Sequence, residues 1–583
     1  MSLSKYRPSR LLGELPLPTA ALTIEQVRGL IFDLVRTYWL EQGGDLPLRE
    51  LADFGAEVQI DPRLSGALEP FGKSLAQMSP LDASFVVGRL YTALLPREYR
   101  SRHGIYFTPP PLARRLLELT RKCGVDLGTA AVLDPACGGG AFLAPVATAK
   151  LAQYRALEPS RKLELLSRTI SGYEIDRFSA WLSQVFLDTV FRPVAEAAGE
   201  VLPVLISVRD ALEEIATERY DLVIGNPPYG RVKLDKDRRQ LFQRGLYGHA
   251  NNYGLFTDLA LRLTRQGGVV AFVTPTSFLS GQYFKNLRRL LVAEASPVHL
   301  EFISDREGVF DDVLQETMLA TFRREASSPG ARVRRLNVQP EGDILVEDVG
   351  ALRLPGNPEL PWLLPREPGH SRHVDAARRF PNRLRDFGYR VSTGPLVWNR
   401  HKNQLRSSTG PNRYPLVWAE AVKTDGTFTF SARRRNHLPY FEVRPVKDDW
   451  LLVRSPCILL QRTTAKEQRR RLIAAELPQQ FLDQHGAAVV ENHLNMIWSN
   501  GAPTVPPRII ASLLNSQLLD ELFRCLSGSV AVSAFELEEL PLPPRPVLER
   551  YLEYLDSGAP VDVLDEVLES AYRDGFAPTP APG

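Results

Sequence analysis

Four consecutive residues, Asn226-Pro227-Pro228-Tyr229, have the types and order needed to hold a planar amino group. They follow the apolar run 221–225, which is typical of a buried strand, so we expect them at the carboxyl end of that strand. Proline stiffens the turn, which would leave the Asn226 side-chain oxygen and the Pro227 carbonyl pointing the same way. Two aligned acceptors suit an NH2 group, and the Tyr229 ring could stack on a flat base. Asn226, Pro227 and Tyr229 are therefore the candidate catalytic residues.

Three further segments place an acidic residue at the end of a predicted strand. In 131–143 the strand ends in Asp134 and a glycine-rich turn that opens a helix, while Glu174 and Asp210 follow the next two strands. Glycine lets a backbone approach a ligand closely, and an acid at a strand end typically accepts from ribose hydroxyls. The turn lacks the spacing of a dinucleotide or phosphate loop, so neither of those sites is predicted.

Taken in order, these motifs resemble those of the amino-group DNA methyltransferases that use S-adenosylmethionine, specifically the TaqI-like adenine-N6 enzymes. The Phe-x-Thr-Pro motif of that family is matched by residues 106–110, ahead of the glycine turn and the Asn-Pro-Pro-Tyr tetrapeptide. The resemblance implies an α/β fold with a doubly wound S-adenosylmethionine-dependent methyltransferase domain. It also implies site-specific methylation of the N6 amino group of an adenine flipped out of double-stranded DNA, in a restriction-modification or related defence system.

The same resemblance implies roles for residues around the cofactor, S-adenosyl-L-methionine. Glu174 would bind the ribose hydroxyls, Ile175 would contact the adenine ring of the cofactor, and Asp210 would accept from its exocyclic amine. Tyr229 and Phe310 would wall the target base, although Phe310 fits a core position equally well. The other candidate cofactor-binding residues are Thr108, Asp134, Ala136, Cys137, Gly138 and Ala211.

The implied chemistry needs positioning more than a strong base. A sulfonium methyl is already electrophilic, whereas the lone pair of an adenine amine is delocalised into the ring. Two acceptors on the NH2 would draw the nitrogen toward tetrahedral geometry and align it for in-line attack. The base must leave the DNA stack to reach such a pocket. No metal is expected.

A basic block at 381–471 predicts contact with a polyanion. It holds 19 Lys or Arg against 7 Asp or Glu, a net charge of +12, so the rest of this +3 chain carries −9. Such asymmetry is typical of nucleic-acid binding, with a solvated surface as the alternative. Segments 391–402 and 458–464 resemble parts of target-recognition domains. The candidate DNA-binding residues are Arg400, Lys402, Arg433, Arg434, Arg435 and Arg462.

The periodicity along the 583 residues predicts five parts. They are an N-terminal helical region (1–100), the methyltransferase domain (101–325), a connector (326–380), a mixed α+β DNA target-recognition domain (381–545), and a C-terminal helix with a disordered tail (546–583). Thr23 and Gln26 are spaced like a helix capping box. Four cysteines without a pattern argue against a disulfide framework or structural zinc. No stretch is apolar enough to span a bilayer, so we expect a cytoplasmic monomer without a membrane partner.

Several alternatives remain open on the sequence alone. Cytosine-C5 methylation needs a cysteine nucleophile, but Cys457 lies in an apolar run that fits a core strand better. Cytosine-N4 enzymes favour Ser at the position of Asn226. RNA-base and protein-glutamine methyltransferases use the same tetrapeptide, and a non-catalytic DNA-binding subunit is a further class. A separate cognate restriction endonuclease could accompany the chain as a partner.

Overall fold

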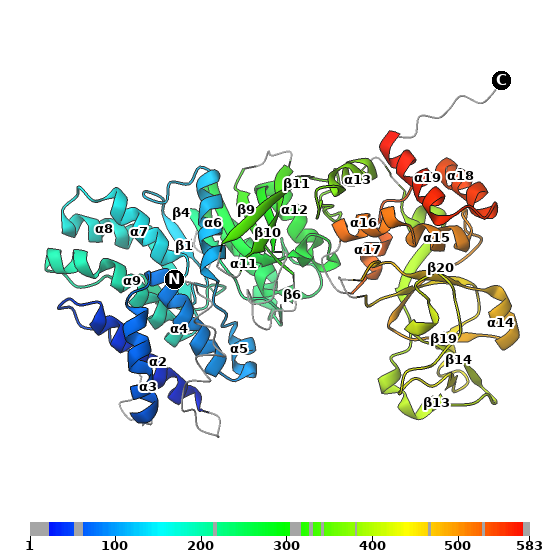
Figure 1. Ribbon diagram of the computed structural model, residues 1–583, viewed down its shortest axis with the longest axis horizontal. Helices are drawn as coiled ribbons and strands as arrows, with labels where there is room; N and C mark the ends of the chain where they lie inside the picture. Colours follow the sequence, from blue (N-terminus) through cyan, green and yellow to red (C-terminus); the bar gives the residue numbers. More distant parts are fainter. Residues whose placement is uncertain are drawn as a thin grey trace. The chain divides into compact units, whose positions relative to one another are not determined.

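The computed structural model describes residues 22–51, 62–213, 219–303, 316–325, 330–339, 343–378, 380, 382–464, 468–526 and 531–574. Phe310 and the tail predicted to be disordered lie outside these residues. The chain divides into two compact units, the first made of Met1–Pro275 with Asn286–Asp348 and the second of Thr276–Lys285 with Val349–Gly583. Figure 1 shows the elements of both units.

Helices form the beginning of the first unit. They are α2 (Ile24–Glu41), α3 (Pro62–Leu75), α4 (Pro80–Leu94) and α5 (Arg97–His103). The predicted capping box is confirmed, because the Thr23 hydroxyl accepts from the Gln26 N–H and the Gln26 side chain accepts from the Thr23 N–H. The apolar faces of α2 and α4 share one hydrophobic cluster with the long helix α9 (Arg177–Ala198).

A nine-stranded sheet is the centre of the first unit, in the order β11-β10-β8-β9-β7-β4-β1-β2-β3. β9 runs antiparallel to both of its neighbours, whereas the pairings from β7 through β3 are parallel. The strands are β1 (Val132–Asp134), β2 (Ile170–Glu174), β3 (Ile206–Val208), β4 (Tyr220–Gly225), β7 (Thr264–Pro275), β8 (Ser296–Ile303), β9 (Thr317–Arg323), β10 (Gly330–Val338) and β11 (Ile344–Arg353).

Helices cover both faces of this sheet. Alternate residues of one strand point to opposite faces, yet Leu222, Val223 and Ile224 of β4 are all fully buried. Continuous burial of this kind is typical of a sheet covered on both sides. The flanking helices are α6 (Pro110–Lys122), α7 (Leu143–Gln153), α8 (Pro159–Thr169), α9, α11 (Asn252–Leu263) and α12 (Lys285–Glu294). The predicted doubly wound α/β fold is confirmed.

The second unit mixes short strands with helices, which confirms the predicted α+β class. A four-stranded sheet has the order β12-β20-β17-β18 and a five-stranded sheet the order β13-β15-β14-β19-β16. The strands are β12 (Tyr389–Thr393), β13 (Leu405–Arg406), β14 (Arg413–Val417), β15 (Tyr440–Glu442), β16 (Leu452–Val453), β17 (Cys457–Gln461), β18 (Ala474–Leu477), β19 (Ala488–Val490) and β20 (Leu494–Ser499). The helices are α13 (His370–Ala377), α14 (Gln479–His485), α15 (Pro507–Leu514), α16 (Gln517–Leu526), α17 (Ala534–Glu538), α18 (Arg545–Asp556) and α19 (Val561–Asp574).

The described residues contain neither a helix able to span a membrane nor a cluster of metal-ligating side chains. Among them, no helix combines the length and the hydropathy needed to cross a lipid bilayer. Within the same residues, no group of three or more His, Cys, Asp or Glu side chains could hold a metal ion. All four cysteines are unpaired and buried.

Candidate active site

The carboxyl ends of β1, β2 and β4 bring the predicted acids and the tetrapeptide to one edge of the sheet. The strand order reverses next to β1, which is the place where open α/β sheets bind ligands. Asp134 ends β1, Glu174 ends β2, and Asn226 directly follows β4. The ends of β1 and β4 lie close together, because a Cβ on Gly225 of β4 would be 2.7 Å from the Asp134 carboxylate oxygen Oδ1 of β1.

The glycine turn is packed too tightly for larger residues. Gly138 and Gly140 have φ of 50° and 79°, in the left-handed region that glycine adopts without strain. A Cβ on Gly139 would lie 2.2 Å from the Phe107 ring. The Cys137 N–H donates to the Tyr173 carbonyl at 3.0 Å, which ties the turn to β2. Thr108 is buried, and burial raises the pKa of the Cys137 thiol well above its usual range.

Glu174 and Asp134 are acceptors fixed by backbone N–H groups. The Glu174 oxygen Oε2 accepts from Gly138 N–H at 2.9 Å, and Oε1 accepts from the N–H groups of Ile175 and Asp176, both at 2.9 Å. A carboxylate has about four lone-pair positions, so capacity for a ligand hydroxyl remains. Asp134 is buried and accepts from Ala136 N–H at 3.1 Å. Burial raises the pKa of both carboxyls.

The candidate cofactor-binding residues that follow β2 and β3 differ in exposure. Ile175 is 55% exposed, unusual for a large aliphatic side chain, whereas Ala211 is buried. Asp210 accepts from Leu212 N–H at 3.0 Å through Oδ1, and its other oxygen pairs with Arg238 at 3.1 Å. Arg238 lies on the short helix α10 (Lys236–Leu241) and has no motif around it, so this contact could not be predicted from the sequence.

The tetrapeptide 226–229, the candidate catalytic segment, contains a contact that its sequence did not predict. The Tyr229 hydroxyl donates to the Asn226 side-chain oxygen at 2.8 Å and lies 3.4 Å from the Val273 carbonyl of β7. Its ring meets Tyr253 edge-on, with centroids 6.4 Å apart. Burial raises the pKa of Tyr229 well above its usual range, so the hydroxyl keeps its proton. Pro227 is buried and Asn226 is half-buried.

Helix α5 ends against the second proline of the tetrapeptide. Gly104 terminates this helix with φ of 65°, and a Cβ there would lie 2.8 Å from the Pro228 Cβ. A side chain at Gly104 would therefore both strain the backbone and displace the proline.

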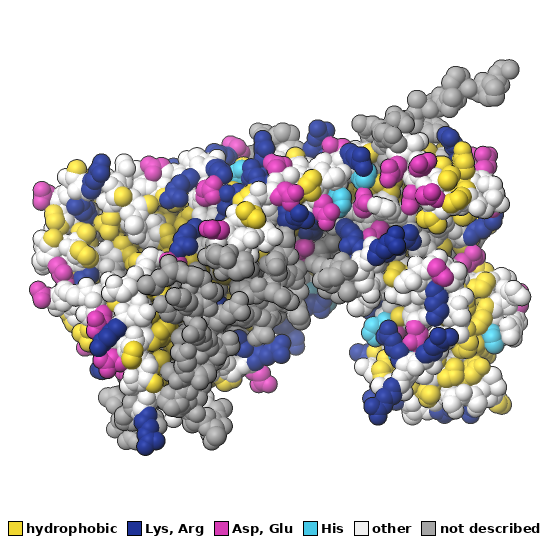
Figure 2. All heavy atoms as spheres, viewed as in Figure 1, with side chains coloured by type: hydrophobic (Ala, Val, Ile, Leu, Met, Phe, Trp, Pro, Cys, Tyr) yellow, Lys and Arg dark blue, Asp and Glu magenta, His cyan; other side chains and the backbone are white. Residues whose placement is uncertain are grey.

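The candidate DNA-binding residues lie outside the strands and α-helices of the second unit. Arg400 ends a short 3-10 helix (Trp398–Arg400), and Lys402 begins another (Lys402–Gln404). Arg400 and Lys402 are exposed, and the Lys402 ammonium is 5.7 Å from the centroid of the Trp398 ring. Arg433, Arg434 and Arg435 are also exposed. Figure 2 shows Lys and Arg side chains gathered on the lobe that carries β13 and β14, beside a band of hydrophobic side chains.

Two of the candidates have partners within the unit. Arg434 pairs with Glu420 at 3.4 Å. Arg462 is half-buried and donates to the Asn492 carbonyl at 3.2 Å, so part of its guanidinium is used to hold the strand end.

Acids close in space neutralise several other cations of the basic block. Arg406 and Arg413 share Glu442 at 2.9 and 3.0 Å. The remaining pairs of this kind are Arg444 with Asp448, Arg454 with Asp449, and Arg383 and Arg385 with Glu539. The acids inside the block are already counted in its net charge of +12, whereas Glu539 lies outside it and offsets further positive charge.

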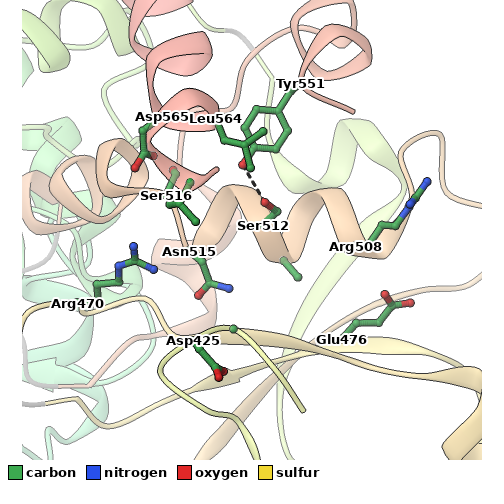
Figure 3. Close-up of a pocket in the computed structure, with 13 residues that line it drawn as sticks. Asp425, Arg470, Glu476, Arg508, Ser512, Asn515, Ser516, Tyr551, Leu564 and Asp565 are labelled. Atoms are coloured by element: carbon green, nitrogen blue, oxygen red, sulfur yellow. Dashed lines mark hydrogen bonds between the residues drawn. The ribbon is translucent and has the colours of Figure 1, made fainter. Parts of the chain in front are cut away.

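A pocket of about 280 Å³ lies in the second unit between the 425–426 turn, α15 and the last two helices. Arg470, Arg508, Glu476 and Asp565 are among its lining residues, and the hydroxyls of Ser512 and Tyr551 lie 2.8 Å apart (Figure 3). None of the sequence-predicted site residues lines this pocket. Its mixture of acids and cations does not indicate one class of ligand.

Cys457, the thiol considered for cytosine-C5 chemistry, lies in the core strand β17. It is 1% exposed, and burial raises its pKa to about 12. A thiol that stays protonated is a poor nucleophile. The prediction of a buried core cysteine is confirmed.

Residues 166–310 match the family model described as Eco57I restriction-modification methylase. The chain is 25% identical over 484 residues to the Type II methyltransferase M.BsuBI of Bacillus subtilis, which covers 77% of this chain and 89% of that protein. It is 26% identical over 363 residues to the Type II methyltransferase M.PstI of Providencia stuartii, covering 60% of this chain and 70% of that protein.

One solved structure, the Type IIL restriction-modification enzyme MmeI in complex with DNA, shares the fold with a TM-score of 0.50. The superposition covers 95% of this chain and 88% of that one at 15% identity. At that level of identity the likeness concerns the fold alone.

Proposed function

This chain is related to the restriction-modification methylases, and we propose that it methylates the N6 amino group of adenine at specific sites in double-stranded DNA. The observation that carries the proposal is the position of Asn226. Asn226 is half-buried and directly follows β4, beside the glycine turn, and its side-chain oxygen accepts from the Tyr229 hydroxyl at 2.8 Å.

The methyl donor is S-adenosylmethionine, and the residues at the sheet edge fit it. Glu174 is a fixed carboxylate with acceptor capacity for ribose hydroxyls. The exposed face of Ile175 offers an apolar surface for a flat adenine ring, and Asp210 offers an acceptor for its amine. Thr108, Asp134 and the 136–138 backbone would lie at the methionine part, with Ala211 next to the adenine. When bound, the cofactor supplies an electrophilic methyl group.

The residues of the chain then have to activate a weak nucleophile. Asn226 Oδ1 and the Pro227 carbonyl would each accept one N–H of the target amine. These two bonds draw the nitrogen toward tetrahedral geometry and place its lone pair for in-line attack. As the new C–N bond forms, the S–CH3 bond of the donor would break and its sulfur would leave as a neutral thioether. The nitrogen would then be cationic, so its surplus proton would leave to solvent and no strong base is required.

The target adenine would have to leave the helix to reach this edge of the sheet. Tyr229 would stack on the flipped base, with Phe310 as a second wall. We propose that residues 381–545 recognise the DNA site through exposed cations, with Arg400, Lys402, Arg433 and Arg435 on phosphates. Arg462, which is partly engaged in the fold, is our candidate for reading a base edge.

One experiment tests the proposal directly. The purified chain is incubated with S-adenosylmethionine carrying a labelled methyl group and, in parallel reactions, with plasmid DNA, RNA or a protein extract. Modified bases or side chains are identified by hydrolysis, and modified positions in the DNA are mapped by sequencing. N6-methyladenine at a recurring sequence is the expected result. Label in N4-methylcytosine, RNA or a glutamine side chain instead would replace the adenine assignment. Cofactor binding without transfer to any of these would favour a non-catalytic subunit.

A further inference from the structure

A buried acid lies directly behind the predicted ribose-binding turn. Asp176 caps helix α9 by accepting from Ser179 N–H at 2.8 Å through Oδ2. Its other oxygen, Oδ1, accepts from the Arg28 guanidinium at 2.9 Å, and the Tyr99 hydroxyl lies 3.3 Å away. The Asp176 side chain is 3% exposed, so little water reaches it and the ion pair with Arg28 is largely buried on the acid's side.

Arg28 reaches Asp176 from helix α2, far away in the sequence. The Arg28 nitrogen Nη2 also donates to the Tyr99 hydroxyl at 2.9 Å, and the guanidinium carbon is 5.8 Å from the Phe178 ring centroid. The guanidinium is therefore held on several sides and fixes the position of the acid.

The backbone of the same acid supports Glu174. The Asp176 N–H and the Ile175 N–H both donate to Glu174 Oε1 at 2.9 Å. A displacement of Asp176 would thus move one donor away from the ribose-binding carboxylate and tilt Ile175, the proposed adenine contact.

We propose that Arg28 is a positioning residue for the cofactor, acting through Asp176 on Glu174 and Ile175. This inference rests on the proposed function, because those two residues are the proposed ribose and adenine contacts. The N-terminal helical region would then support the cofactor site indirectly, because Arg28 acts on it through Asp176.

A second ion pair of the same kind provides a matched control. Arg49 also comes from the N-terminal region, and it binds Asp188 of α9 at 2.8 Å, with the Asp188 side chain fully buried. Asp188 lies twelve residues after Asp176, or about 18 Å along a helix axis. Loss of this pair should weaken the packing on α9 in the same way, without reaching the ribose-binding turn.

The test compares Arg28→Met and Arg49→Met in the full chain by calorimetric titration with S-adenosylmethionine, thermal unfolding and steady-state kinetics. Arg28→Met should weaken cofactor binding at least about fivefold, raise KM for the cofactor, and leave kcat at saturating cofactor within about twofold. Arg28→Lys, which keeps the charge, should recover part of the affinity. Arg49→Met should lower the unfolding temperature and leave cofactor affinity unchanged.

Since Arg28→Met leaves a buried acid without its cation, the variant could fail to fold. The double variant Arg28→Met with Asp176→Asn removes both charges and keeps a capping side chain. It should still bind the cofactor more weakly than the wild type. The inference would be overturned if Arg28→Met or the double variant bound the cofactor with wild-type affinity. It would also be overturned if Arg49→Met lost as much cofactor affinity as Arg28→Met. A wild-type chain that binds no S-adenosylmethionine would instead overturn the proposed function itself.

Discussion

The Tyr229 hydroxyl donates a 2.8 Å hydrogen bond to the side-chain oxygen of Asn226. The contact fixes the rotation of the amide, which otherwise has a broad and nearly two-fold torsion. An amide oxygen has two lone pairs, so the same atom can hold the tyrosine and still accept from a substrate amine. Tyr229 is therefore expected to act twice, by orienting the acceptor and by stacking on the base.

Asn226→Ala should remove most methyl transfer while leaving cofactor affinity intact. The change deletes one acceptor of the target amine, and loss of a single such group typically costs about 100-fold or more in kcat. Transfer of labelled methyl to DNA measures the first quantity, and calorimetry measures the second. Near-normal turnover would remove Asn226 from the catalytic centre.

Tyr229→Phe should have an intermediate effect. It keeps the ring and removes only the hydroxyl that orients Asn226, so we expect a loss of about tenfold in kcat, equivalent to one hydrogen bond. Tyr229→Ala removes the stacking surface as well and should be more severe. Single-turnover rates for the two variants separate these contributions. If Tyr229→Phe matched the wild type, the hydroxyl would have no positioning role.

The sequence could predict the acids at the strand ends, because apolar runs and the acids that follow them are local features. It could not predict the approach of the Tyr229 hydroxyl to the Val273 carbonyl, since Val273 belongs to a strand that is distant in sequence. The contacts of Arg28 and Arg238 could not be predicted for the same reason. The net charge of the basic block is counted correctly from the sequence, but that count leaves out Glu539, which pairs with the block from outside it.

Gly139→Ala should destabilise the cofactor turn. The new Cβ would lie 2.2 Å from the Phe107 ring, and overpacking of this kind costs about 1–3 kcal/mol. We expect a lower free energy of unfolding together with weaker binding of S-adenosylmethionine. The control is Gly66→Ala in α3, where nothing lies within 4 Å of the added Cβ. That change should stabilise the helix by up to about 1 kcal/mol. A Gly139 variant that behaved like the Gly66 variant would contradict the close packing.

Exposed and paired arginines should differ in their contribution to DNA affinity. Arg433→Ala and Arg435→Ala should each lower the slope of log affinity against log salt by about one, because each lost phosphate contact releases fewer counterions. Arg413→Ala, which removes a cation already paired with Glu442, should change the slope much less. Fluorescence anisotropy on a methylatable and a scrambled duplex provides the slopes. Equal slopes for all variants would place the DNA surface elsewhere.

Lys150 should make stability depend on pH. It is fully buried, and burial lowers its pKa from its usual 10.5 to about 8 in the folded state. Between these values the unfolded chain binds more protons, so the free energy of unfolding rises with pH. From pH 7 to 9 this gain is about 1 kcal/mol. Denaturant titrations of the wild type and Lys150→Met at both pH values should show the gain only in the wild type. If the free energy of unfolding changed by the same amount in both proteins, Lys150 would be charged in the folded state.

The five-stranded sheet of the second unit has a hydrophobic cluster of its own, which includes Trp418, Phe441 and Val489. The exposed cations proposed to meet DNA lie outside the strands, and neighbouring residues such as Trp398 and Ala432 pack on this cluster, so we expect their exchange to cost little stability. Such exchanges replace no side chain of the nine-stranded sheet. Under the proposed function, new DNA specificities would then arise by substitution on a surface, while the proposed transfer chemistry stays the same. Selection on these segments would let enzymes of this design diverge in the sites they methylate without passing through an inactive ancestor.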